Sequence, residues 1–289
     1  MITILPDFYD RFQCKAGDCL HSCCKGWEID IDEATAQRYS EDRTPFGEEL
    51  RKHIQTSEEG ASFILTEDER CPFLQENGLC RLILAKGEDI LCDICTNHPR
   101  FFTYLGKLEL AGVGLCCEEA CSLLLSSGEE LRFCTEDGER FFTLAELLEE
   151  FGIPFAPEEL VFSPETAENA FDSVMAIMRE TEPINEAWTE GLKSLERSRS
   201  DILSRISARY FEYPEEAFNR IYQMLLYRQL EMLETEPMGR ICEFAHINTQ
   251  FIFYAYMQTG DLAESLRSWS EQIEYDTDNV EIVYEKIGK

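Results

Sequence analysis

Cysteines carry most of the chemistry that this sequence could perform. Twelve of the 13 lie between Cys14 and Cys134, and most stand within a few residues of another. The ordered groups are Cys14-x4-Cys19-x3-Cys23-Cys24, Cys71-Pro-Phe-Leu followed by Cys80, Cys92-x2-Cys95, and Cys116-Cys117-x3-Cys121. Clustered thiolates are typical ligands of zinc and of iron–sulfur clusters. The chain must therefore fold back on itself to bring these groups to shared metal centres.

Disulfide bonds are the weaker interpretation of the same thiols. The first residues lack the basic start and long apolar run of a signal peptide, and no apolar run reaches the roughly 18–20 residues of a membrane span. We therefore expect a cytoplasmic protein with no membrane partner, in a compartment that keeps thiols reduced. Inert buried thiols are a further alternative, and Cys242, far from the groups, is expected to be one.

The net charge limits the class of partner. The chain carries a formal charge of −31, with 25 acidic against 13 basic side chains in residues 1–135 and 32 against 13 in the remainder. Such a surface repels phosphate backbones, so we expect no nucleic-acid partner. It favours a cationic target such as a lysine-bearing protein, although solubility explains the charge equally well.

The two parts of the chain differ in their amino-acid pattern. Residues 1–135 mix short apolar runs with Gly, Pro and Cys, and include a predicted hairpin over 101–113 with its turn at Gly106-Lys107. Residues 136–289 show apolar residues at helical spacing and are expected to form an α-helical domain. The predicted fold class is mainly α, with a small α+β cysteine-rich N-terminal metal-binding domain.

Other motifs add little. After Cys19 and Cys23 position 26 is Gly, so the Cys-x3-Cys-x2-Cys motif of radical S-adenosylmethionine enzymes is not met, and no glycine-rich nucleotide loop follows a strand. His21 and His98 lie among the cysteines, where supporting roles are favoured over zinc ligation. Arg100 follows Cys95 by five residues and predicts either an ordinary salt bridge or binding of an anionic ligand.

The ordered cysteines and their neighbours resemble the flagellin lysine-N-methylase family, within which lies a broader metal-chelating cysteine domain. The resemblance rests on Phe12-x-Cys14-x4-Cys19-x3-Cys23-Cys24-x-Gly26-Trp27, Cys71-Pro-Phe-Leu, Gly78-Leu-Cys80, Cys95-x3-Pro99-Arg100 and Cys117-x-Glu119-Ala120. It continues through Leu226-Tyr-Arg228, Gly239-Arg240-Ile241 and Trp269-Ser-x-x-Ile273-Glu274. It therefore covers nearly the whole chain, although family members often run longer at the C-terminus.

The resemblance implies methyl transfer from S-adenosylmethionine to lysine side chains of flagellin, or of another lysine-bearing protein. It implies an iron–sulfur cluster, of the 4Fe-4S type, or zinc as the metal cofactor, and makes Arg100 a candidate for cofactor binding. The implied metal ligands are Cys14, Cys19, Cys23, Cys24, Cys71, Cys80, Cys95 and Cys117. Cys92, Cys116 and Cys121 stand outside the family series and rank lower.

A methyl acceptor lysine must lose its proton before it reacts, which requires a base or a desolvated pocket. Asp30, Asp32 and Glu118 lie near predicted ligands and are weak candidates for the base, since a helix cap or a solvated carboxylate is the favoured role of each. Two further functions use the same thiols: a non-catalytic iron or zinc carrier, and a zinc-stabilised protein-interaction module. The distance between ligand sulfurs distinguishes the two metal centres: it is about 3.7 Å around one zinc ion and about 6 Å around a cubane cluster.

Overall fold

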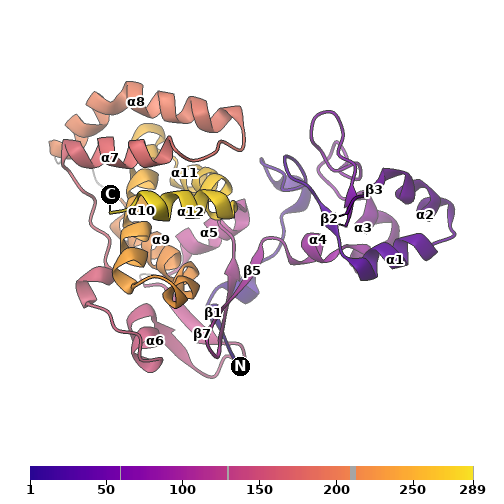
Figure 1. Ribbon diagram of the computed structural model, residues 1–289, viewed down its shortest axis with the longest axis horizontal. Helices are drawn as coiled ribbons and strands as arrows, with labels where there is room; N and C mark the ends of the chain where they lie inside the picture. The colour runs from indigo at the N-terminus through magenta and orange to yellow at the C-terminus, as the bar shows by residue number, and fades with distance from the viewer. Residues whose placement is uncertain (59, 129, 209–212, 289) are drawn as a thin grey trace. The chain divides into compact units, whose positions relative to one another are not determined.

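Helices dominate the structure, as predicted. The computed structural model describes residues 1–58, 60–128, 130–208 and 213–288 (Figure 1). Helix accounts for 55% of the chain and strand for 13%. Among the described helices, none combines the length and apolar character that a membrane span requires.

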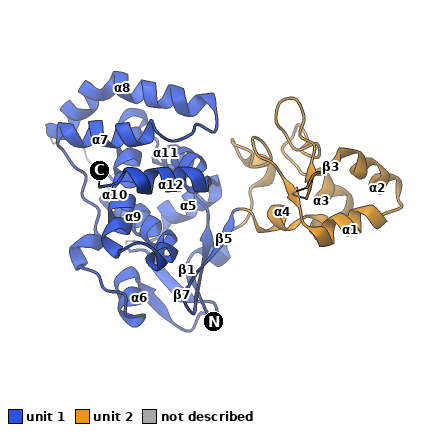
Figure 2. Cartoon of the chain, in the orientation of Figure 1, with its two compact units in different colours: residues 1–12, 99–289 blue, residues 13–98 orange. Residues whose placement is uncertain are grey.

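The chain divides into two compact units, one inserted in the other. The smaller unit is residues 13–98, and the larger unit joins residues 1–12 to residues 99–289 (Figure 2). The expected division at residue 135 falls inside the larger unit. Strand β1 (Ile2–Pro6) explains this, because it pairs with β6 (Leu108–Val113) and with β7 (Arg132–Thr135) and so ties the first residues to the second half of the chain.

A five-stranded sheet forms one part of the larger unit, in the order β5-β6-β1-β7-β8. Strand β5 (Arg100–Leu105) and β6 form the predicted hairpin, and β8 (Phe141–Thr143) is the other edge. β1 runs parallel to β6, and the other neighbours are antiparallel. Tyr227 fixes helix to sheet, since its hydroxyl donates to the carbonyl oxygens of Ile4 (2.7 Å) and Ala111 (2.9 Å).

The larger unit also contains the long buried helix α10 and several further helices. The elements are η1 (Tyr9–Arg11), α5 (Glu118–Ser126), α6 (Leu144–Glu150), η5 (Pro157–Leu160), α7 (Glu168–Met178), α8 (Glu186–Ser207), α9 (Glu215–Arg228), η6 (Leu230–Glu234), α10 (Met238–Thr259), α11 (Leu262–Trp269), a π-helical turn η7 (Ser270–Glu274) and α12 (Thr277–Lys286). α10 packs against α7, α8, α9 and α11, consistent with its apolar residues on every side (Figure 1).

The smaller unit has its own core. Its elements are η2 (Ala16–Asp18), β2 (Asp30–Ile31), α1 (Glu33–Glu41), α2 (Pro45–Leu50), η3 (Arg51–His53), β3 (Ile54–Thr56), β4 (Ala61–Phe63), α3 (Arg81–Lys86), η4 (Glu88–Ile90) and α4 (Asp93–Asn97). The three strands pair in the order β2-β4-β3. Phe63 and Phe73 pack edge to face at 5.3 Å, and the same core contains the side chains of Cys71 and Cys92. Two of the predicted metal-binding segments are thus part of the packing that holds this unit together.

Candidate metal centre

Backbone pairing brings the first two cysteine groups together. The amide of Cys71 donates to the carbonyl oxygen of Cys24 over 2.8 Å, and the amide of Gly26 donates to that of Glu69 over 2.9 Å. These two bonds form a short antiparallel ladder between segments almost 50 residues apart in the sequence. They place the Cys24 and Cys71 thiols at the same end of the small core.

Cys71 begins a tight turn that leads back to Cys80. The amide of Leu74 donates to the carbonyl oxygen of Cys71 over 3.0 Å, and Leu74 then pairs with Cys80 in an isolated antiparallel bridge. The amides of Phe73 and Leu74 also donate toward the Cys71 sulfur. Backbone N–H groups directed at a sulfur stabilise its thiolate form, which is the form that binds metal.

Two more thiols stand at helix starts. Cys80 is the N-cap of α3, and Cys92 is the N-cap of α4, with Cys95 one turn further along. The thiol of Cys95 donates a hydrogen bond to the sulfur of Cys92. The amino end of a helix favours negative charge, so these positions suit thiolates.

The five sulfurs of Cys24, Cys71, Cys80, Cys92 and Cys95 share one core and influence one another's ionisation. Burial raises the pKa of Cys71 to about 12, with smaller contributions from the charges of Cys24 and Cys80. Burial also raises the pKa of Cys80. The hydrogen bond to Cys92, together with burial, raises that of Cys95. We name these five residues the core thiols.

Their mutual repulsion has a direct chemical meaning. Several thiolates crowded into an apolar core cannot all ionise unless a cation offsets their charge. Thiolates are the donors that zinc and iron–sulfur clusters use, so the donor type fits these groups. In the described part of the chain, however, no three His, Cys, Asp or Glu side chains are grouped closely enough to hold a single metal ion.

The first cysteines of the series lie on the surface of the smaller unit. Cys14 and Cys23 are exposed and Cys19 is half-buried. Cys23 nevertheless contacts the core thiols, because its thiol donates to Cys24 and lowers the pKa of Cys24 to about 7. The carbonyl oxygen of Cys23 also accepts from the indole of Trp27 over 2.8 Å, which fixes this loop.

The remaining predicted ligand, Cys117, belongs to the larger unit together with Cys116 and Cys121. Cys117 is the N-cap of α5, and Cys121 is fully buried, with its thiol donating to the carbonyl oxygen of Leu115 over 2.9 Å. Burial raises the pKa of Cys116 and of Cys121, and the Glu274 carboxylate adds to both effects. These thiols form a second group, separate in the chain from the core thiols.

The structure gives Asp32 a structural role. One oxygen accepts from the amide of Thr35 over 2.8 Å and caps α1, and the other accepts from the amide of Asp93 over 3.0 Å at the start of α4. The bond from Asp93 is the largest cause of a lowered pKa for Asp32. A carboxylate whose two oxygens are occupied in this way is a poor proton acceptor. Asp30 is exposed on β2, and Glu118 opens α5.

Arg100 faces aromatic rings in the larger unit. Its guanidinium lies 5.1 Å from the ring centre of Phe12 and 5.6 Å from that of Tyr9. Such cation–π contacts hold the segment before the inserted unit against the start of β5. An ordinary salt bridge was one expectation for Arg100, whereas the contacts that the structure describes for it are with these two rings.

Cys92, which ranks lower among the predicted ligands, lies among the core thiols. It is 0% exposed, lies in the core with Cys71, and accepts a hydrogen bond from the thiol of Cys95. The Cys92-x2-Cys95 spacing was the available signal, because two residues at that distance share the first turn of a helix.

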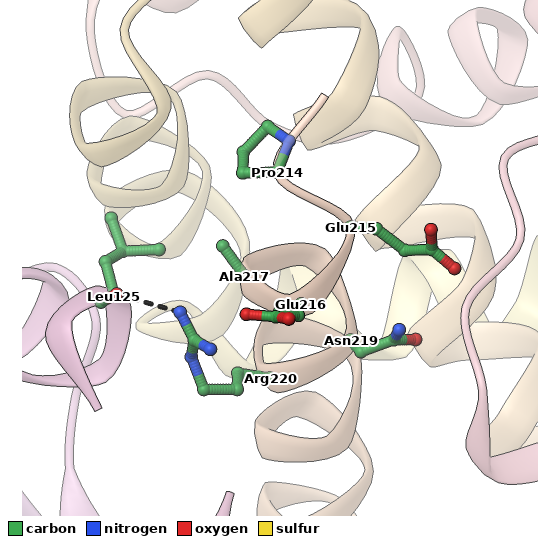
Figure 3. Close-up of a pocket in the computed structure, with 7 residues that line it drawn as sticks. All are labelled: Leu125, Pro214, Glu215, Glu216, Ala217, Asn219 and Arg220. Carbon is green, nitrogen blue, oxygen red and sulfur yellow. Dashed lines mark hydrogen bonds between the residues drawn. The ribbon is translucent and has the colours of Figure 1, made fainter. Parts of the chain in front are cut away.

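A hollow of about 560 Å³ lies at the amino end of α9 (Figure 3). None of the predicted site residues lines it; its walls are Leu125, Pro214, Glu215, Glu216, Ala217, Asn219 and Arg220. Arg220 is not available to a ligand there, because it donates to the carbonyl oxygens of Leu124, Leu125 and Gly128 at the end of α5. The hollow is therefore not assigned to the chemistry of the thiols.

Three known proteins are similar to part of this chain. The flagellar biosynthetic protein FliU of Salmonella muenchen is 30% identical over 142 residues, which cover 44% of this chain and 78% of that protein. The chain belongs to the flagellin lysine-N-methylase family. Lysine-N-methylases of Salmonella typhimurium and Salmonella choleraesuis are each 29% identical over 133 residues.

These two relatives are much longer than the matched region. The match covers 44% of this chain and 33% of each lysine-N-methylase, so the chain spans about a third of the length of these members of the family. No protein-family model and no solved structure matches the chain.

Proposed function

We propose that the chain is a protein-lysine N-methyltransferase that transfers methyl groups from S-adenosylmethionine to lysine side chains of flagellin in the cytoplasm. The observation that carries the proposal is the similarity to two proteins named lysine-N-methylase and to a flagellar biosynthetic protein. The charge of −31 supports a lysine-bearing substrate, because it attracts a cationic surface.

The reaction sets a requirement on proton removal. The neutral amine nitrogen bonds to the methyl carbon as the carbon–sulfur bond of the donor breaks, and the amine then sheds a proton. Lysine is protonated at neutral pH, and an acidic surface holds it in that form. The site must therefore contain a base or remove water from the amine. Asp30 and Glu118 remain candidates for the base, whereas the two capping bonds of Asp32 argue against it.

An iron–sulfur cluster in the smaller unit forms the second part of the proposal, with Cys24, Cys71, Cys80 and Cys95 as its ligands. These thiols support the proposal by their shared core and by the N–H groups directed at the Cys71 sulfur. A cubane cluster needs sulfurs about 6 Å apart and one zinc ion needs them about 3.7 Å apart, so the sulfur separations in the metal-loaded protein distinguish the two. A bound cluster would neutralise the thiolates and link four segments of the chain.

The experiment is a methylation assay with the anaerobically purified chain, recombinant flagellin and S-adenosylmethionine labelled in its methyl group. The proposal expects label on flagellin lysines, identified by mass spectrometry of its peptides, and a brown protein absorbing near 400 nm. Cys71→Ser should remove both, while Cys242→Ser, a buried thiol of the larger unit, should keep both. A colourless zinc-loaded protein without methylation would favour the interaction module, and a brown protein without methylation the iron carrier.

A further inference from the structure

Strand β5 is paired with another strand of its sheet on one side only. It is the end strand of the five-stranded sheet, and its register with β6 runs from Arg100 opposite Val113 to Leu105 opposite Leu108. The amide of Gly114 donates to the carbonyl oxygen of Pro99 over 2.7 Å, which shows that the odd-numbered residues bond to β6. Hydrogen-bonding direction alternates along an antiparallel strand, so the N–H and C=O groups of Phe102 and Tyr104 are directed away from β6.

The side chains of the same two residues form an exposed aromatic pair on the outer face of the sheet. Phe102 is 45% exposed and Tyr104 is 52% exposed, whereas their neighbour Phe101 is buried. Glu109 organises this face, because its carboxylate accepts from the hydroxyls of Tyr104 (3.1 Å) and Thr3 (2.8 Å). Edge strands are usually protected by Lys, Pro or a bulge. The segment Phe102-Thr103-Tyr104 has neither Lys nor Pro.

Charge indicates which kind of chain could pair with this edge. Glu109 lies on β6 beside it, and η6, which packs against β5, carries Glu231 and Glu234. The nearby cations are engaged elsewhere: Arg100 with Tyr9 and Phe12, and Arg228 with the ring of Phe101 and with Glu274. Lys107 stands in the hairpin turn. Two copies of a chain with a charge of −31 repel each other, which opposes pairing of β5 with itself.

We propose that β5 docks an extended, lysine-bearing segment of a partner protein, which adds as a further strand beside Phe102 and Tyr104. Backbone hydrogen bonds to these two residues would supply affinity, and lysine side chains would lie along the two rings and Glu109. The lysine-bearing nature of the partner rests on the proposed function. The open edge and the aromatic pair do not.

The test is fluorescence anisotropy of a labelled peptide of alternating Lys and Thr, titrated with the full chain at physiological ionic strength. A second peptide of the same sequence, with alternate backbone amides methylated, keeps the charge but cannot pair as a strand. Phe102→Pro removes an N–H that faces the open edge, so the β5–β6 ladder should survive, and circular dichroism checks the fold. Phe141→Ser is the matched control, because Phe141 is 55% exposed on the opposite edge strand.

Binding of the first peptide should weaken by about tenfold in Phe102→Pro and in the pair Phe102→Ser with Tyr104→Ser, and stay unchanged in Phe141→Ser. The methylated peptide should bind at least about tenfold more weakly. Equal binding of both peptides would overturn the proposal, because it would show that charge alone attracts the peptide. Unchanged affinity of the β5 variants for the first peptide would overturn it as well. A dimer in sedimentation that Phe102→Pro dissolves would instead assign the edge to a second copy. The binding assay contains no methyl donor, so its result is independent of the methylation assay. A chain that methylates flagellin but does not bind the peptide refutes this proposal alone. A chain that binds the peptide but does not methylate flagellin refutes only the proposed function.

Discussion

Gly17 and Gly78 lie back to back in the smaller unit. A Cβ atom on Gly78 would stand 2.7 Å from the Cα of Gly17, and one on Gly17 would stand 2.4 Å from the carbonyl oxygen of Asn77. The loop between Cys14 and Cys19 therefore touches the turn that leads to Cys80, backbone against backbone. Only glycine allows two backbone segments to approach this closely.

Gly78→Ala is expected to separate these two segments. Gly78 has φ +76° and Gly260 has φ +74°, so alanine must adopt a positive φ at both, but nothing lies within 4 Å of a Cβ at Gly260. Gly78→Ala should lower the unfolding temperature more than Gly260→Ala and reduce the iron retained after anaerobic reconstitution. Calorimetry and iron analysis measure the two effects. Equal behaviour of the two variants would show that the contact does not matter.

Cys71→Ser and Cys95→Ser should each abolish the absorption near 400 nm, because a cluster that loses a thiolate ligand also loses the local fold that it organises. Cys134→Ser serves as the control, since Cys134 lies on β7 in the larger unit. Iron and acid-labile sulfide per chain are the quantities to measure. Full iron content in both ligand variants would exclude these residues as ligands.

Cys92→Ala should reduce iron content more than Cys14→Ala, which reverses the ranking drawn from the family series. Cys92 is 0% exposed and hydrogen-bonded to the thiol of Cys95, whereas Cys14 is exposed. Metal analysis of both variants, on samples whose circular dichroism matches that of the unaltered protein, decides the order. Greater loss in Cys14→Ala would return Cys92 to a packing role.

His98 should make the smaller unit less stable in mild acid. Burial lowers the pKa of its imidazole from 6.5 to about 4, so the unfolded chain binds a proton that the folded chain does not between these values. The contribution of the neutral His98 imidazole to the free energy of unfolding is fully present above pH 6.5. It is lost as the pH falls toward 4, by up to about 3 kcal/mol. Urea unfolding of the metal-free chain across this range measures the slope. His98→Gln should flatten this slope, and an unchanged slope in His98→Gln would assign it to other groups.

Arg220→Leu should destabilise the larger unit by about 3 kcal/mol, because three carbonyl oxygens at the end of α5 lose a buried charged donor (Figure 3). The comparison is Arg199→Leu, which removes exposed ion pairs to Asp172 and Glu168 and should cost much less. Chemical denaturation of both variants gives the two free energies. A similar loss in both would mean that water replaces the guanidinium of Arg220.

Local pattern determined much of this protein in advance. The thiol series identified the family, the Gly106-Lys107 turn with its flanking apolar runs gave the hairpin of β5 and β6, and apolar residues at helical spacing marked α9 and α10. The Cys71-Pro-Phe-Leu turn was also readable, because its hydrogen bonds join neighbours in the sequence. Such features depend on residues within a few positions of one another, and the sequence states those directly.

Tertiary structure alone decided how the thiols are divided. Pairing of β1 with β6 and β7 assigns residues 1–12 to the larger unit. Cys117 belongs to the same unit, whereas the core thiols belong to the smaller one. Asp32 became a double cap only because α4 begins beside it, 61 residues away. Burial of Cys92 and exposure of Cys14 likewise follow from packing between distant segments. No local propensity encodes these contacts, since each depends on which remote surfaces the folded chain brings together.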